Sequence, residues 1–157
     1  WKTTHWGGKL RFEIHYRNDQ VKEYYKNSGI QTVGSAGFDL VCVEDLVFDK
    51  FGELQMIDLG VIIKPPRGHH SLVMPRSSTF KKYGLIQSNS VGLIDEDYCG
   101  PEDYWMFPVL YLRHGTTSIP AGTRLAQFIF QKTNKITKIY EFNPDGDSRG
   151  GFGSTGN

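Results

Sequence analysis

The segment Pro75-Arg76-Ser77-Ser78 combines a cation with two hydroxyl groups at the expected start of a short helix. Free backbone N–H groups and the helix dipole favour an anion at such a position, so phosphate is the natural ligand. The same residues also allow an ordinary helix cap beside a surface arginine. Phosphate binding is therefore indicated where other parts of the chain supply matching groups.

Residues 89–98 place acids and an aromatic ring directly after an apolar stretch. Asp95, at the expected end of a strand, can serve as a general base. Tyr98, three residues later, can offer its ring face to a sugar. An exposed acidic turn is the alternative interpretation.

Two further segments contain polar residues among residues typical of a buried strand. Asp39 lies in residues 36–40, where a buried carboxylate must pair with a cation or hold a water on a metal ion. In residues 122–128, Arg124 can neutralise Asp39 or another acid. Gln127 has both a donor and an acceptor, so it can orient a phosphate oxygen or a water.

The chain ends in Gly151-Phe152-Gly153-Ser154-Thr155-Gly156-Asn157. In an arm that closes over a ligand, Phe152 can stack on a planar base. The glycine backbone and the hydroxyls of Ser154 and Thr155 can donate to phosphate oxygens. The stretch also fits the dinucleotide pattern G-x-G-x-x-G, but that pattern requires a following helix, and we expect none. A polar tail without a ligand is the alternative.

Many short segments, separated by glycine and proline turns, must position these clusters. Alternating or apolar patterns predict strands at residues 9–16, 38–43, 54–63, 71–74, 83–87, 106–112, 124–130 and 136–142. This spacing predicts an all-β fold of the β-sandwich or jelly-roll type. Helix is expected only as two turns at residues 20–27 and as a short helix at residues 78–83. Ser77 or Ser78 would cap the latter and Gly84 would end it.

Composition excludes several classes of protein. With 157 residues the chain suits one domain, and 18 Lys plus Arg against 17 Asp plus Glu leave no electrostatic footprint for nucleic acid or an anionic membrane. No apolar run approaches a membrane span. Cys42 and Cys99 form no C-x-x-C motif, so reduced thiols are expected. We expect a soluble intracellular protein in the cytoplasm, the nucleus or an organelle.

Taken in order, the five clusters resemble the motifs of the trimeric dUTPase family over about residues 36–156. That family hydrolyses dUTP to dUMP and pyrophosphate, which limits uracil incorporation into DNA and supplies dUMP for thymidylate synthesis. The resemblance implies a jelly-roll-like fold with one short helix and a homotrimer with shared active sites. The expected domain is residues 1–142, and residues 143–157 would form a mobile arm over the nucleotide.

The resemblance also implies a role for each cluster. Asp95 would activate the attacking water, Arg76 and Gln127 would act beside the phosphates, and Asp39 would hold a magnesium ion through water. The hairpin containing Asn89 would recognise uracil, with Tyr98 beneath the deoxyribose. The residues implied to bind the substrate are Ser77, Ser78, Asn89, Gly92, Ile94, Tyr98, Arg149, Phe152, Gly153, Ser154 and Thr155.

Two segments depart from the family pattern. In Arg149-Gly150-Gly151-Phe152 the arginine is two residues nearer the phenylalanine than in the usual Arg-Gly-x-Gly-Gly-Phe, which affects its implied contact with the terminal phosphate. Residues 99–105 form a longer link after the tyrosine, at the trimer surface or the pocket rim.

Two alternatives remain from the sequence. The dCTP deaminases are similar in fold and phosphate motifs, but they generally lack the Phe-Gly-Ser-Thr arm. A regulator that binds the nucleotide and acts through protein contacts, with residues 101–105 as a candidate contact surface, belongs to a different class. Release of pyrophosphate, of ammonia or of neither distinguishes the three hypotheses.

Overall fold

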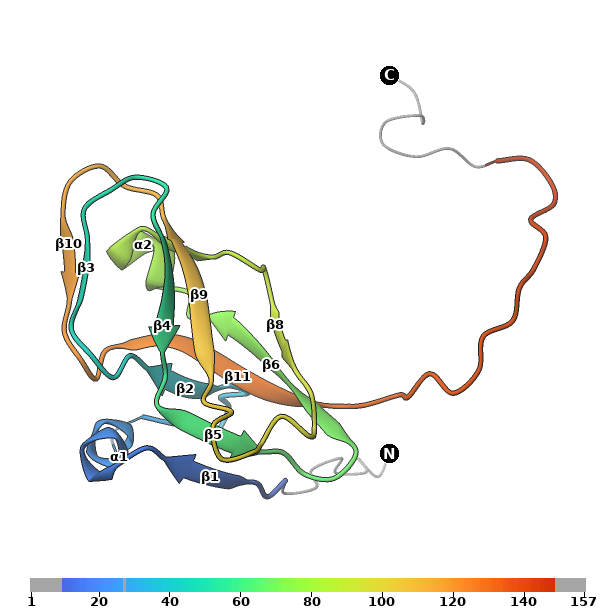
Figure 1. Ribbon diagram of the computed structural model, residues 1–157, viewed down its shortest axis with the longest axis horizontal. Coiled ribbons are helices and arrows are strands. Elements are labelled where there is room, and N and C mark those ends of the chain that lie inside the picture. The colour runs from blue at the N-terminus through green and yellow to red at the C-terminus, as the bar shows by residue number, and fades with distance from the viewer. Residues whose placement is uncertain (1–9, 27, 149–157) are drawn as a thin grey trace, which may run out of the picture.

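The computed structural model describes residues 10–26 and 28–148. This part of the chain consists mainly of short strands, with two short helices (Figure 1). The helices are α1 (Asp19–Tyr25) and α2 (Thr79–Tyr83). The strands are β1 (Glu13–Tyr16), β2 (Phe38–Val41), β3 (Leu46–Phe48), β4 (Leu54–Asp58), β5 (Val61–Lys64), β6 (His69–Pro75), β7 (Leu85–Gln87), β8 (Gly92–Ile94), β9 (Met106–Tyr111), β10 (Thr117–Ile119) and β11 (Arg124–Lys132).

Antiparallel pairing joins the described strands into four sheets. The largest has the order β2-β11-β6-β8 and the next has the order β4-β9-β7, while β1 pairs with β5 and β10 with β3. Strand β11 pairs with β2 along one edge and with β6 along the other. Three polar clusters that lie far apart in the sequence therefore meet on neighbouring strands.

Large rings fill the core between these sheets. Trp105 and Phe107 are 1% and 0% exposed. Trp105 contacts Phe128 of β11 edge-to-face, with ring centroids 5.1 Å apart. Burial of each such side chain contributes about 2–3 kcal/mol. The core thus holds the strands that carry the polar clusters in a fixed arrangement.

Different contacts position the first turns of the two helices. Helix α1 begins after Asn18, whose side chain accepts a hydrogen bond from Val21 N at 2.9 Å. Ser78 occupies the cap position of α2 but forms no capping bond. Instead the buried Thr79 hydroxyl donates to Leu125 O at 2.6 Å. Gly84, at φ 70°, ends α2 as expected. Contact with β11, rather than a local cap, positions α2.

The expected all-β, antiparallel architecture is confirmed, with three corrections. Residues 54–63 form two strands rather than one, because Gly60 at φ 63° turns the chain between β4 and β5. The family resemblance implied one short helix, whereas helices form at both regions where the residue pattern predicted them. The strand expected at residues 136–142 does not form.

Residues 134–148 run away from the body of the protein without helix or strand (Figure 1). Their apolar side chains at Ile136, Ile139, Tyr140 and Phe142 are 75–86% exposed. The segment has the composition of a strand, but a strand forms only where a partner supplies hydrogen bonds. Within the described residues it has no such partner. The division into a domain at residues 1–142 and an arm at residues 143–157 stays a prediction.

Both cysteines are free, with Cys42 buried and Cys99 half-buried. Burial raises the pKa of the Cys42 thiol to about 11, so this group stays protonated at neutral pH. None of the helices in the described ranges has the length and apolar composition needed to cross a membrane.

Candidate active site

Asp39 on β2 is held by two arginines from neighbouring parts of the large sheet. Arg76, directly after β6, donates from Nε to Asp39 Oδ1 at 3.0 Å. Arg124, at the start of β11, donates from Nη1 to Asp39 Oδ2 at 3.3 Å. The Asp39 side chain is only 7% exposed, and a buried carboxylate requires such partners. The expectation that a cation neutralises this carboxylate is confirmed.

The surface around this ion pair is rich in hydrogen-bond donors. The side chains of Arg76 and Arg124 are 26% and 36% exposed, and together they carry more N–H groups than one carboxylate accepts. Beside them, the hydroxyls of Ser77 and Ser78 form no hydrogen bond with any described residue. Two guanidinium groups against one carboxylate leave a net positive charge. This combination suits the oxygens of a phosphate chain.

Gln127 joins this cluster from the middle of β11. It lies opposite Asp39 in the strand register, and its Nε2 donates to Pro75 O at 3.2 Å. Its amide lies against Gly37, where a Cβ atom would be 2.6 Å from Gln127 Oε1. The sequence interpretation assigned no role to Gly37, although a glycine directly before a buried strand is a recognisable sign of close approach. We name Asp39, Arg76, Arg124 and Gln127 the phosphate cluster.

Replacing Gly37 with alanine is expected to displace the Gln127 amide while the fold remains intact. The backbone of Gly37 is compatible with alanine, and the clash falls on the end of a flexible side chain. A displacement of about 1 Å at a positioning group lowers turnover by about 10-fold to 100-fold. Steady-state hydrolysis and thermal unfolding measure the two effects. Gly34→Ala is the control, because nothing lies within 4 Å of its Cβ position. Equal turnover in both variants would contradict this role of Gly37.

Segment 85–94, which runs from β7 through Asn89 to β8, borders a second candidate site. The expected hairpin is not a paired one, because β7 pairs with β9 and β8 pairs with β6. A cavity of about 280 Å³ is lined by four expected residues, Asn89, Gly92, Ile94 and Tyr98. The rest of its wall was not expected and consists of Met56, Val73, Leu93, Tyr104, Trp105, Met106 and Pro108. Most of these residues come from β4, β6, β9 and the segment directly before β9. No local spacing in the sequence links them to segment 85–94. A mostly apolar wall with one carboxamide is typical of a pocket for a small ring.

Asp95 directly follows β8. Its neighbour Ile94 pairs with Ser71, so Asp95 lies near the His70 end of β6. Asp95 is exposed and borders a cavity of about 700 Å³. The other residues around this cavity are Arg67, His70, Glu96, Asp97, Thr133 and Lys135. The basic groups among them were not expected from the sequence.

Asp95 and Arg76 lie at opposite ends of β6, while Gly92 pairs with Val73 nearer its middle. Asp95 is near His70, whereas Arg76 follows Pro75 at the other end. Six residues of extended strand correspond to about 20 Å. One chain therefore brings the phosphate cluster together, and separately brings residues 89–98 together, but does not bring the two sets to one point. The expected arm residues Arg149, Phe152, Gly153, Ser154 and Thr155 lie outside the described residues.

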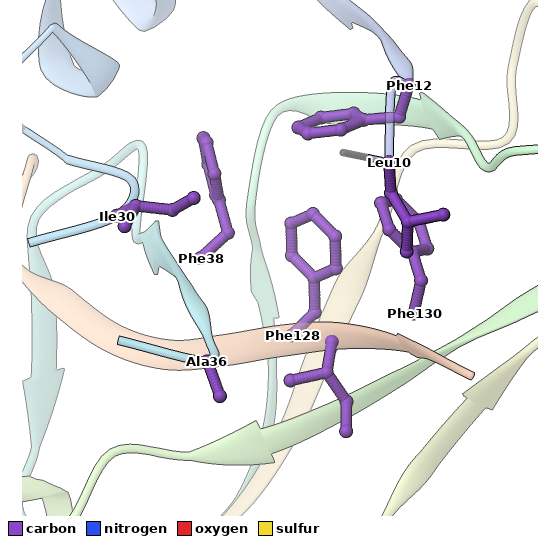
Figure 2. A pocket seen from close by; sticks show the side chains of 8 residues that line it. Leu10, Phe12, Ile30, Ala36, Phe38, Phe128 and Phe130 are labelled. Atoms are coloured by element: carbon purple, nitrogen blue, oxygen red, sulfur yellow. The ribbon is translucent and has the colours of Figure 1, made fainter. Parts of the chain in front are cut away.

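A groove of about 650 Å³ lies beside β2 and β11 (Figure 2). Its wall consists of Leu10, Phe12, Ile30, Ala36, Phe38, Phe128, Ile129 and Phe130. The phenyl rings contact one another, with the centroids of Phe12 and Phe130 5.2 Å apart. A lining without charged side chains does not suit a triphosphate, so this groove is not the candidate nucleotide site.

The phosphate cluster suits a magnesium ion held through water rather than one bound directly by its side chains. In the part of the chain that the structure describes, no three His, Cys, Asp or Glu side chains gather as a metal site. Each oxygen of Asp39 already accepts from a guanidinium group, but a carboxylate oxygen has a second lone pair. Asp39 thus suits a metal-bound water rather than the metal itself. A bound triphosphate would supply the oxygen ligands that magnesium prefers.

An antiparallel β protein with a phosphate cluster and a separate ring-sized pocket has the architecture of a nucleotide-binding protein. The dUTPase family model matches residues 24–156. The chain is 43% identical over 119 residues to the SPbeta prophage-derived deoxyuridine 5'-triphosphate nucleotidohydrolase YosS of Bacillus subtilis (strain 168), covering 75% of this chain and 82% of that protein. The chain therefore belongs to the dUTPase family.

Solved structures agree with this assignment. The dUTPase from Streptococcus mutans aligns with a TM-score of 0.68 at 26% identity, covering 81% of this chain and 98% of that chain. A mutant dUTPase from phage phi11 of S. aureus, described with a structural Mg(II) ion, aligns with a TM-score of 0.67 at 19% identity. That alignment covers 85% of this chain and 99% of the phage protein, and it shows the shared fold.

Proposed function

We propose that this chain is a dUTP diphosphatase that hydrolyses dUTP to dUMP and pyrophosphate. Membership of the dUTPase family, over residues 24–156, is the observation that carries this function. The reaction limits uracil incorporation into DNA and supplies dUMP for thymidylate synthesis. A dCTP deaminase, the alternative with a similar fold, is disfavoured by the same family match.

In the proposed mechanism, the phosphate cluster binds and aligns the triphosphate. Arg76, Ser77 and Ser78 donate to phosphate oxygens, and Gln127 holds the α-phosphate for in-line attack. Asp95 accepts the proton of the attacking water. A magnesium ion bound with the triphosphate would withdraw negative charge from it, with Asp39 holding that ion through water.

The cavity of about 280 Å³ beside segment 85–94 is proposed to hold the nucleoside. Asn89, Gly92 and Ile94 would recognise uracil, and the Tyr98 ring would lie beneath the deoxyribose. A backbone carbonyl that accepts from uracil N3–H would face a bare lone pair if cytosine entered, and a buried mismatch of that kind is strongly rejected. Arg149, Phe152, Gly153, Ser154 and Thr155 would close over the base and the phosphates from the arm.

The proposed active site is shared between subunits of a homotrimer. Asp95 and Gln127 must both act within a few ångströms of one phosphorus. Gln127 pairs with Met74, and Asp95 lies beside His70, so about 13 Å of β6 separates their positions. This separation supports the view that different chains supply them. The exposed apolar residues of segment 136–142 and the apolar groove of Figure 2 are surfaces that a neighbouring subunit would cover.

An assay of several deoxynucleoside triphosphates with magnesium tests the function. We expect dUTP to give pyrophosphate and dUMP, and dCTP to give neither pyrophosphate at a comparable rate nor ammonia. Ammonia from dCTP would instead support the deaminase. Binding of dUTP without any product would support a regulator that acts through protein contacts.

A further inference from the structure

Gln87 is a buried polar residue at a strand position where an apolar residue is expected. In β7 the side chains of Leu85 and Gln87 both point inward, and Gln87 is 7% exposed. Its Nε2 donates to Val73 O at 3.2 Å and to Asn89 Oδ1 at 2.9 Å. Its Oε1 is buried and has no hydrogen-bond partner among the described residues. The Nε2 amino group therefore makes both hydrogen bonds of this side chain.

The direction of the Gln87 amide follows from the backbone. Val73 O can only accept, so the amino end of Gln87 must face it. The same amino group also faces Asn89, which must then turn its Oδ1 towards Gln87. Reversing either carboxamide would oppose two oxygen atoms, or two amino groups, inside the protein. A single backbone carbonyl thus determines the orientation of both side chains, and Asn89 keeps its Nδ2 as the donor for other partners.

The contacts of Gln87 lie at one wall of the cavity of about 280 Å³ beside segment 85–94. Asn89, Val73 and Gly92 all line it. A Cβ atom on Gly92 would lie 3.3 Å from Gln87 Nε2 and 3.3 Å from Val73 Cβ. The glycine allows β8 to lie directly over the Gln87 amide. Gln87 is therefore behind the wall, and Asn89 is the carboxamide that the cavity presents.

We propose that Gln87 is a positioning residue that makes Asn89 a hydrogen-bond donor towards the pyrimidine base. This role of Gln87 rests on the proposed function as a dUTPase. Uracil has a carbonyl oxygen at C4, which accepts from Asn89 Nδ2. Cytosine has an amino group at C4, so two donors would face each other. Without Gln87, the Asn89 amide can rotate and present Oδ1, which suits cytosine equally well.

The test is Gln87→Met, which keeps the side-chain length but removes both hydrogen bonds. We expect the ratio of kcat/KM for dUTP to that for dCTP to fall about tenfold, the effect of roughly one hydrogen bond. In an Asn89→Ala background, Gln87→Met should cause no further fall, because it acts through Asn89. Gln131→Met, at an exposed position on β11, is the matched control and should leave the ratio unchanged.

A second variant avoids dependence on packing around Gln87. Asn89→Asp retains an oxygen for Gln87 and presents another oxygen to the base, so the preference should shift towards dCTP. An unchanged ratio in Gln87→Met, or an equal fall with and without Asn89, would overturn the proposal. Calorimetric binding of non-hydrolysable dUTP and dCTP analogues to the full trimeric protein gives the same comparison without turnover. Selective binding without hydrolysis would then contradict the proposed function alone, and absence of binding would contradict both.

Discussion

Replacing Asp95 with asparagine is expected to lower dUTP turnover by about 100-fold to 10,000-fold, the usual effect of losing a general base. Asparagine has nearly the same shape but cannot accept the proton of water. The Asp95 side chain is exposed and forms no ion pair with any described residue, so its charge contributes little to stability. The fold and the affinity for a non-hydrolysable dUTP analogue should therefore remain nearly unchanged.

Asp97→Asn is the matched control for this variant. It removes the same charge from the same cavity, two residues further along the chain. Single-turnover kinetics with magnesium should separate the two variants, because a general electrostatic effect would slow both to a similar degree. Near-normal turnover in purified Asp95→Asn would rule out the assignment of Asp95 as the base.

Mixing two inactive variants is expected to restore activity if the active site is shared. One chain carries Asp95→Asn and the other carries Arg76→Ala, so each retains the group that the other lacks. In trimers assembled at random from equal amounts, about one quarter of the sites receive an intact Arg76 from one subunit and an intact Asp95 from its neighbour. Activity should thus rise from a background near zero to about one quarter of the wild-type value.

The two chains should be unfolded together, refolded and checked for trimers by light scattering before the assay. Each variant refolded alone is the control. Recovered activity would not depend on a new contact, because mixing changes only which subunits carry the intact Asp95 and the intact Arg76. If the mixture stays as inactive as its parts while mixed trimers are present, both groups must act within one chain, and the separation along β6 would have to close by a conformational change.

The local sequence was sufficient to predict the antiparallel β architecture, whereas the roles of the candidate site residues stay predictions. Turn residues and alternating apolar residues report the local backbone, so most long strands and both helical regions were predicted. Strands β3, β8 and β10 have three residues each and are too short to show a period. The buried Asp39 also predicted a cationic partner, because an isolated charge in the core is unfavourable.

Only the tertiary structure decided which residues meet. Arg124 and Asp39 are 85 residues apart in sequence, and their contact depends on the pairing of β11 with β2. The same pairing pattern places Asp95 and Arg76 at opposite ends of β6, which no local spacing reveals. The contact from Val73 O through Gln87 to Asn89 likewise depends on how β6, β7 and β8 lie together.

Segment 136–142 shows why local sequence predicts the backbone conformation of a segment but not its pairing partner. Its apolar side chains indicate that it can form a strand, but that pattern does not identify the partner. The segment is extended and exposed, because hydrogen bonding and burial require a second strand, which none of the residues in 10–26 and 28–148 supplies. Local sequence determines which conformations the backbone favours, whereas long-range pairing determines which of them form and which side chains share a site.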